Sequence, residues 1–115
     1  MTRDEITRAV VRGKQAMTRT RYYVGLTTQH GRPVSQVARD SLTATVAAHY
    51  GGGCTIYQAV GYWKGAREES QVYEVLGEMQ GTPFQPELLA AHLASVADQS
   101  SVLWTCEEVQ GGFEP

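Results

Sequence analysis

Runs of apolar residues with two different spacings follow one another along the chain, and they predict alternating strands and helices. Short runs rich in aromatic and β-branched residues predict strands. Apolar residues repeated every three or four positions predict amphipathic helices. The predicted strands cover 20–28, 54–63, 70–78 and 101–109, and the predicted helices run from Ser35 to about Tyr50 and onward from Pro86.

In chain order, these elements are β-α-β-β-α-β. This is the order of the ferredoxin-like fold, in which a four-stranded antiparallel sheet carries both helices on one face. The preference for right-handed crossover connections leaves few competing topologies. We therefore predict an α+β domain of this kind.

Local signals mark the ends of the helices and the turn between the middle strands. Ser35 suits an N-cap, the glycines at 51–53 suit the end of the first helix, and Pro86 suits the first turn of the second. A turn around residues 64–66 joins two strands into a hairpin. The apolar stripes expected to face the core are Val37, Leu42, Val46 and Tyr50 on the first helix and Leu89, Leu93 and Val96 on the second.

The first 18 residues are predicted to form a separate basic amphipathic helix. Thr2 and Glu5 have the spacing of a capping box, and a thin apolar stripe follows them at helical spacing. Residues 19–110 then form the ferredoxin-like domain, a sandwich of sheet and helices, and residues 111–115 form a short tail.

Composition and charge narrow the class of protein. A chain of 115 residues, 42% of them hydrophobic, suits one globular domain. No apolar run is long enough to span a bilayer and the charged N-terminus does not resemble a secretory signal, so we expect a cytoplasmic protein. Residues 1–21 hold six basic and two acidic side chains, whereas residues 61–115 hold two basic and nine acidic ones. The basic segment either forms a solvated helix face, or binds an anion or an acidic surface. That surface belongs to this chain or to a partner.

The predicted strands do not alternate cleanly between polar and apolar positions. Apolar and aromatic residues occur at both parities, and Gln58, Glu74 and Thr105 are isolated polar positions among them. A sheet face open to water normally shows polar residues at every second position. We therefore expect the second face to be covered as well, by the N-terminal helix or by a second copy. We favour the second copy, which gives a homodimer formed through contact between the two sheets.

Four short motifs follow one another in a fixed order: Gly25-Leu26, Gly31-Arg32-Pro33-Val34-Ser35, Gly61-Tyr62-Trp63 and Glu68-Glu69-Ser70-Gln71-Val72. Over about residues 20–110, their succession resembles a group of small uncharacterised bacterial and actinophage proteins that share a domain of unknown function. The resemblance implies a ferredoxin-like fold and no established chemistry. Gln71 stands where it implies a lysine.

Residue types that often carry catalysis do not form a recognised motif here. The glycines at 51–53 lie between a helix and a strand, which is the reverse of a phosphate-binding loop. The three histidines lack metal-ligand spacing, and no nucleophile elbow is present. Cys54 and Cys106 are expected to be reduced and buried. We therefore expect no catalytic residues, no metal and no cofactor.

Aromatic and basic side chains on the strands are the remaining candidates for a binding site. Aromatic rings of one parity are expected in the core, and the others could wall a pocket in which arginine and lysine bind a small anion such as a nucleotide. No nucleic acid partner is expected, because the aromatic motif of RNA-binding ferredoxin-like domains is absent and the second half of the chain is acidic. Whether the cations of the first strand meet those of the hairpin stays open. The candidate ligand-binding residues are Arg19, Arg21, Tyr23, Tyr57, Trp63, Lys64 and Arg67.

Three functions fit these observations. The first is a non-enzymatic, homo-oligomeric binding module for a small anionic ligand. The resemblance to phage proteins implies a narrower form of this function, a scavenger of signalling nucleotides. The second is a protein-interaction adaptor that uses residues 1–17. The third is a cofactor-free isomerase or monooxygenase-like enzyme with an aromatic pocket, in which Glu74 or His49 carries the proton.

Overall fold

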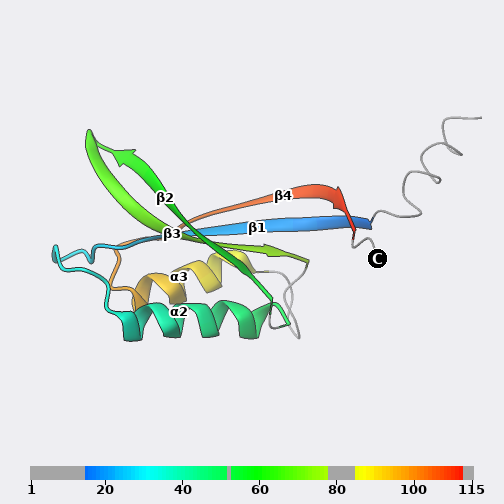
Figure 1. Ribbon diagram of the computed structural model, residues 1–115, viewed down its shortest axis with the longest axis horizontal. Helices are drawn as coiled ribbons and strands as arrows, with labels where there is room; N and C mark the ends of the chain where they lie inside the picture. Colours follow the sequence, from blue (N-terminus) through cyan, green and yellow to red (C-terminus); the bar gives the residue numbers. More distant parts are fainter. Residues whose placement is uncertain (1–14, 52, 78–84, 113–115) are drawn as a thin grey trace, which may run out of the picture.

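The chain forms one antiparallel sheet with two helices packed against it. The computed structural model describes residues 15–51, 53–77 and 85–112. The strands pair in the order β2-β3-β1-β4, and both helices lie on the same face of the sheet (Figure 1). This confirms the α+β class. The elements are β1 (Gln15–Gly25), α2 (Gln36–His49), β2 (Thr55–Trp63), β3 (Ala66–Leu76), α3 (Pro86–Val96) and β4 (Leu103–Gly111).

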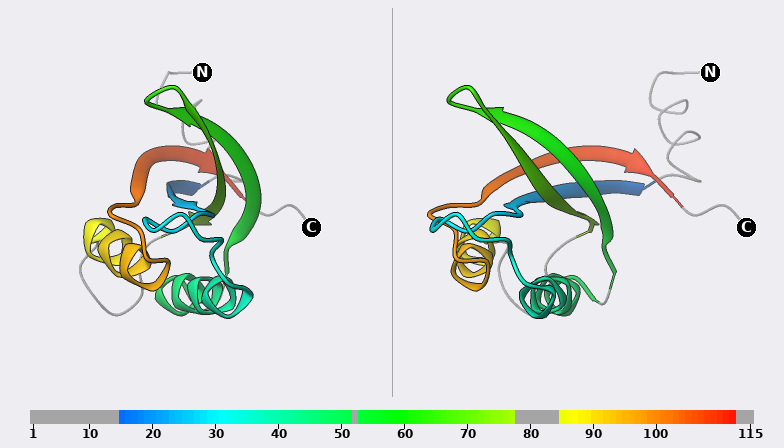
Figure 2. Two further views of the ribbon diagram at one scale, coloured as in Figure 1. Left: turned by 90° about the vertical axis from the view of Figure 1, so that its left-hand side faces the viewer. Right: turned by 60° about the vertical axis from the view of Figure 1, so that its left-hand side comes forward.

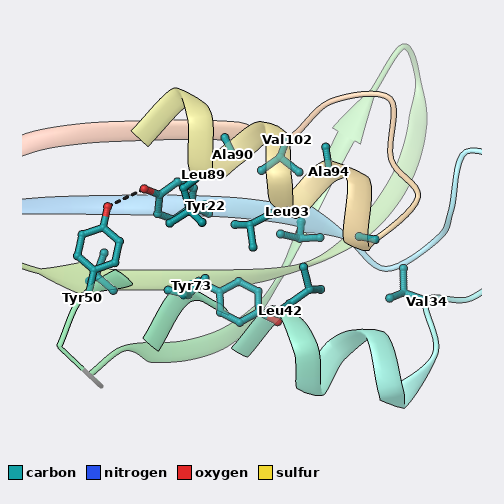
Figure 3. Packing of buried hydrophobic residues seen from close by; sticks show 14 residues of the cluster. Tyr22, Val34, Leu42, Tyr50, Tyr73, Leu89, Ala90, Leu93, Ala94 and Val102 are labelled. Carbon is teal, nitrogen blue, oxygen red and sulfur yellow. Dashed lines mark hydrogen bonds between the residues drawn. The ribbon is translucent and has the colours of Figure 1, made fainter. Parts of the chain in front are cut away.

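The core lies between the helices and the two central strands (Figure 3). Successive side chains of a strand point to opposite faces, and the large apolar side chains of β1 and β3 on the helix-covered face, such as Tyr22 and Tyr73, are buried. Each large apolar side chain buried in this way stabilises the fold by about 1.5–3 kcal/mol. Members of the core include Tyr22, Val24, Tyr73 and Val75 from the sheet and Leu42, Val46, Leu89 and Leu93 from the helices.

Two tyrosines connect the sheet to the end of α2. The hydroxyl groups of Tyr22 on β1 and Tyr50 after α2 share a 2.6 Å hydrogen bond inside the core. Their rings are tilted with centroids 6.3 Å apart. Burial raises the pKa of both phenols above the ordinary value, and the hydrogen bond from Tyr50 raises that of Tyr22 further. Both hydroxyls are therefore held in their neutral form.

Local signals in the sequence correctly mark the ends of α2 and the hairpin turn. The Ser35 side chain accepts a hydrogen bond from the backbone N–H of Ala38, as an N-cap does, and Gly51 follows the helix with φ of 71°. The hairpin between β2 and β3 turns through Lys64 and Gly65, both at positive φ. A two-residue turn of this kind matches the twist of the strands.

The strand ends differ from the sequence predictions. β1 starts at Gln15 rather than residue 20, because it pairs with β4 as far as Gln15 opposite Gly111. The predicted helix over residues 1–18 therefore cannot include its last four residues, and residues 1–14 lie outside the described part of the chain. β3 likewise starts at Ala66 rather than Ser70, because its polar first half is held by pairing with β2.

Two burial predictions were wrong. Val37 is 80% exposed, and Ala38 packs against the core in its place. On a helix with 3.6 residues per turn, Ala38, Leu42 and Val46 share one face and Val37 turns away from it. Cys106 was expected to be buried but is exposed, because it lies on β4, at the edge of the sheet. Cys54 is half-buried, and burial raises the pKa of its thiol.

The hairpin formed by β2 and the first half of β3 extends beyond the helices. Figures 1 and 2 show it curling away from the side of the sheet on which α2 and α3 lie. No residue of β2 is buried, whereas the second half of β3 contributes Val72, Tyr73 and Val75 to the buried set. The sheet thus has a packed centre and a projecting, solvated edge.

Candidate functional site

The face of the sheet that α2 and α3 do not cover, here called the open face, holds most of the candidate residues. In β1, the buried residues Thr20, Tyr22 and Val24 alternate with Arg19, Arg21 and Tyr23, which therefore point to the open face. The register sets their neighbours on this face. Arg21 lies opposite Glu74 of β3 and Thr105 of β4, whereas Tyr23 lies opposite Val72 and Leu103.

Four of these side chains form a charged row across the open face: Arg19, Arg21, Glu74 and Glu107. Arg21 donates through Nε to Oε1 of Glu74 at 2.6 Å. Arg19 donates through Nε and Nη2 to Oε1 of Glu107, at 2.9 and 2.5 Å. Arg21 reaches the same Glu107 oxygen through Nη1 at 3.4 Å. Two guanidinium groups therefore converge on one carboxylate oxygen.

The two carboxylates of the charged row differ in exposure. The side chain of Glu74, on a central strand, is 21% exposed, whereas that of Glu107, on the edge strand β4, is 49% exposed. Hydrogen bonds from Arg19 hold the pKa of Glu107 below its usual range, and the Glu74 carboxylate raises the pKa of Arg21. Two guanidinium groups thus face two carboxylates, and their formal charges cancel within the row.

Apolar and aromatic side chains border the charged row on one side. Val72 has no exposed surface although no helix covers it. Its cross-strand neighbours are Tyr23 and Tyr57, so side chains of the open face itself must cover it. The Tyr57 hydroxyl also donates to Oε1 of Glu74 at 3.4 Å, which joins the aromatic border to the charged row. Burial and the nearby Glu74 raise the pKa of Tyr57.

The structure divides the predicted ligand-binding residues into two groups. Arg19, Arg21, Tyr23 and Tyr57 lie together on the open face. Trp63, Lys64 and Arg67 lie at the far end of the hairpin, where Arg67 contacts Glu69 at 3.5 Å. Arg67 and Glu74 are seven positions apart along β3, which corresponds to roughly 20 Å, and alternation places Arg67 on the other face. The two pairs of cations therefore do not converge.

The two residues proposed as proton carriers also lie apart. Glu74 is ion-paired with Arg21 in the charged row rather than set in an apolar cavity. His49 lies in the last turn of α2, where Nδ1 is 2.8 Å from the carbonyl oxygen of Thr45. Glu74 is thus paired with a residue of the neighbouring strand, and His49 contacts its own helix.

Glu107 is the functional candidate that sequence reasoning missed. Its place in the charged row depends on β4 lying beside β1 with Arg19 opposite Glu107. The opposite charges of 19 and 107 are visible in the sequence, but their pairing requires the register. Leu103 and Val72 were missed for the same reason.

Two hollows lie elsewhere on the surface. One, of about 600 Å³, lies between the loop after β1, the start of α2 and the end of α3. Asp98, which lines it, accepts a 2.6 Å hydrogen bond from Gln29 at Oδ1, and its Oδ2 lies 3.8 Å from Nε2 of His30. The other, of about 340 Å³, lies between α2 and the β2–β3 pair, and its lining residues include Arg39, Gln71 and the predicted binding residue Tyr57. Neither hollow is lined by any of the cationic residues predicted to bind the ligand.

The described residues contain no cluster of three or more His, Cys, Asp or Glu side chains with the geometry of a metal site. Within those same ranges, neither helix is long and apolar enough to cross a membrane. Comparison of the chain with family models, with curated proteins and with solved structures finds no match. The resemblance over residues 20–110 therefore stays a prediction from the motifs alone.

Proposed function

We propose that the protein is a non-enzymatic, homo-oligomeric binding module that holds a small anionic ligand on the open face of its sheet. The observation that carries this proposal is the convergence of Arg19 and Arg21 on one oxygen of Glu107. That oxygen marks a position at which an anionic oxygen contacts two guanidinium groups at once. Planar guanidinium groups are well suited to carboxylate and phosphate oxygens.

Binding at this position exchanges one anion for another. Glu107 is the more exposed carboxylate of the charged row and lies on an edge strand, so it can rotate away while Glu74 stays paired with Arg21. A phosphate or carboxylate oxygen of the ligand then occupies its place. Because the ligand competes with an internal carboxylate, removing that carboxylate strengthens binding.

The aromatic border favours a ligand that also contains a planar ring. Tyr23 and Tyr57 lie one cross-strand row away from the charged row, on the same face. A ring attached to the anionic group can pack on these side chains, as bases do on aromatic residues of single-strand binding proteins. A nucleotide-like ligand has both parts. The narrower role of a phage-type scavenger of signalling nucleotides comes from the motif resemblance alone.

Calorimetric titration of two variants tests this proposal. Inorganic phosphate and a set of nucleoside monophosphates are titrated into the wild type, Glu107→Gln and Glu108→Gln. Glu108 is adjacent in β4 but points to the other face, so its substitution makes the same change in net charge away from Arg19 and Arg21. We expect Glu107→Gln to bind about two- to fivefold more tightly than the wild type, and Glu108→Gln to bind like the wild type. Equal behaviour of the two variants, or no binding to any of the three proteins, contradicts the proposal.

We also propose that the fold is ferredoxin-like. The strand order β2-β3-β1-β4, with antiparallel neighbours and both helices on one face, supports this assignment.

The other two functions gain no specific support from the described residues. The adaptor hypothesis depends on residues 1–17, of which 1–14 lie outside the described ranges and 15–17 belong to β1. The enzyme hypothesis needs a carboxylate or histidine in an aromatic pocket, whereas Glu74 pairs with Arg21 and His49 contacts its own helix.

A further inference from the structure

β2 is an edge strand with an unusual surface. It lies at one end of the strand order, so only one of its two sides is paired within the sheet. Nine large hydrophobic side chains are exposed among the described residues, and five of them lie on this one strand. They are Ile56, Tyr57, Val60, Tyr62 and Trp63. Tyr62 and Trp63 are 75% and 69% exposed.

Nothing in the sequence of β2 protects its free edge. Natural proteins discourage pairing at exposed edges with charged residues, proline, bulges or a covering element. Thr55–Trp63 contains no charged residue and no proline, and it pairs with β3 over its whole length without a bulge. The opposite edge, β4, carries Glu107 and Glu108. The two edge strands thus differ in charge, which is one of the features that discourage the addition of another strand.

We propose that β2 pairs with β2 of a second copy, antiparallel across a twofold axis, so that two four-stranded sheets become one continuous sheet. This deepens the homo-oligomer part of the proposed function and rests on it, but it replaces contact between sheet faces with contact between edges. It does not depend on the anion site.

Charge favours β2 over β4 as the edge that pairs with its own copy. A twofold axis brings each strand against itself, so any charge on the strand meets a like charge nearby. β2 contains no charge, so pairing with its own copy causes no such repulsion. Pairing of β4 with itself would bring Glu107 and Glu108 of the two copies close together. Pairing of β2 with β4 of another copy leaves free edges at both ends and forms open chains instead of closed dimers.

One register suits the side chains of β2 well. With the axis at Ala59, Tyr57 lies opposite the partner's Gly61, and Ile56 lies opposite the partner's Tyr62. Gly61 carries no side chain, so the partner strand approaches Tyr57 without a clash while the Tyr57 hydroxyl keeps its contact with Glu74. The same axis joins the two open faces into a single surface.

Sedimentation velocity of the full chain over a dilution series tests the proposal. The wild type should be a dimer that dissociates on dilution. Val60→Lys, which places a charge on the β2 edge, should move the midpoint of dissociation to a concentration higher by roughly tenfold or more. Val37→Lys makes the same substitution on α2 at an 80% exposed position and should behave like the wild type. Thermal unfolding followed by circular dichroism checks that both variants are folded.

Cysteine cross-linking tests the register. In a Cys106→Ser background, which removes the exposed native thiol, Ala59→Cys places two thiols opposite each other across the axis and should form a covalent dimer on mild oxidation. Val37→Cys in the same background should not. A dimer that forms without this cross-link overturns the register.

A wild type that stays monomeric at all concentrations overturns the proposal, and so does a folded Val60→Lys variant that dimerises like the wild type. The latter result assigns the interface to another surface. A monomer that binds an extended peptide along β2 identifies a different occupant and also contradicts the proposal. Because phosphate and nucleotide titrations of Val60→Lys probe the charged row separately, failure of the dimer and failure of the anion site are distinguishable.

Discussion

β1 and β2 have similar runs of aromatic and β-branched residues, but they are in opposite environments. β1 is a central strand, and its Tyr22 is fully buried under the helices. β2 is an edge strand, and its Tyr62 and Trp63 are largely exposed. The comparison shows that the place of a strand in the sheet order, rather than its composition, decides whether its rings stabilise the monomer or form a surface for contact.

The largest expected effect comes from truncating one apolar side chain in each region. Leu93→Ala, in the core against β1, should lower the free energy of unfolding by about 2–5 kcal/mol. Tyr62→Ala, on β2, should change it by less than about 0.5 kcal/mol when the protein is dilute enough to be monomeric. Urea unfolding measures both. A large loss of stability in monomeric Tyr62→Ala would show that β2 packs within its own chain.

A smaller difference in the free energy of unfolding is expected when a tyrosine hydroxyl is removed from each of the two strands. Tyr22→Phe removes the hydroxyl bonded to Tyr50 and should cost about 1 kcal/mol, whereas Tyr62→Phe removes an exposed hydroxyl and should cost nothing measurable. Chemical unfolding at neutral pH measures the difference. Equal costs for the two variants would contradict the buried hydrogen bond.

The same pair of variants predicts a difference in alkaline stability. The pKa of Tyr22 is raised in the folded state, so its contribution is complete below the unfolded pKa of about 10 and is lost as the pH rises above it. Tyr22→Phe should therefore reduce the fall in stability above about pH 10. Tyr62→Phe removes a phenol that takes no part in this hydrogen bond and serves as the control. Unfolding midpoints measured from neutral to alkaline pH check this.

Sequence signals located the helices better than the strands, and the reason is physical. The end of α2 depends on Ser35 and Gly51, which act on their immediate neighbours. The start of β1 depends on Gly111, which is distant in the sequence and adjacent only in the sheet. Arg19 and Arg21 were correctly singled out as cations of the first strand. Their partner Glu107 was missed because register is a property of the whole fold.

The smallest expected effect concerns two adjacent acidic residues of β4. The pKa of Glu107 is lowered in the folded state, so its contribution is present above the unfolded pKa of about 4.3 and is lost as the pH falls through the folded value. Glu107→Gln should lower the melting temperature by about 2 °C or less at neutral pH. The difference from the wild type should disappear in acid.

Glu108→Gln is the matched control for this prediction, since Glu108 lies on the other face of the same strand. At neutral pH, Glu108→Gln should not show the loss of melting temperature expected for Glu107→Gln. An effect of equal size in both variants would indicate a general response to net charge rather than the ion pairs of the charged row.

The most direct test of the binding proposal is an NMR titration that observes arginine Nε–H groups and backbone amides. Inorganic phosphate and one nucleoside monophosphate are added to the full chain. The proposal predicts that the largest shifts occur at Arg19 and Arg21, and that the nucleotide, but not phosphate, also shifts Tyr23 and Tyr57. Shifts confined to the hollow around Arg32 and His30, or no shifts with either compound, would contradict it.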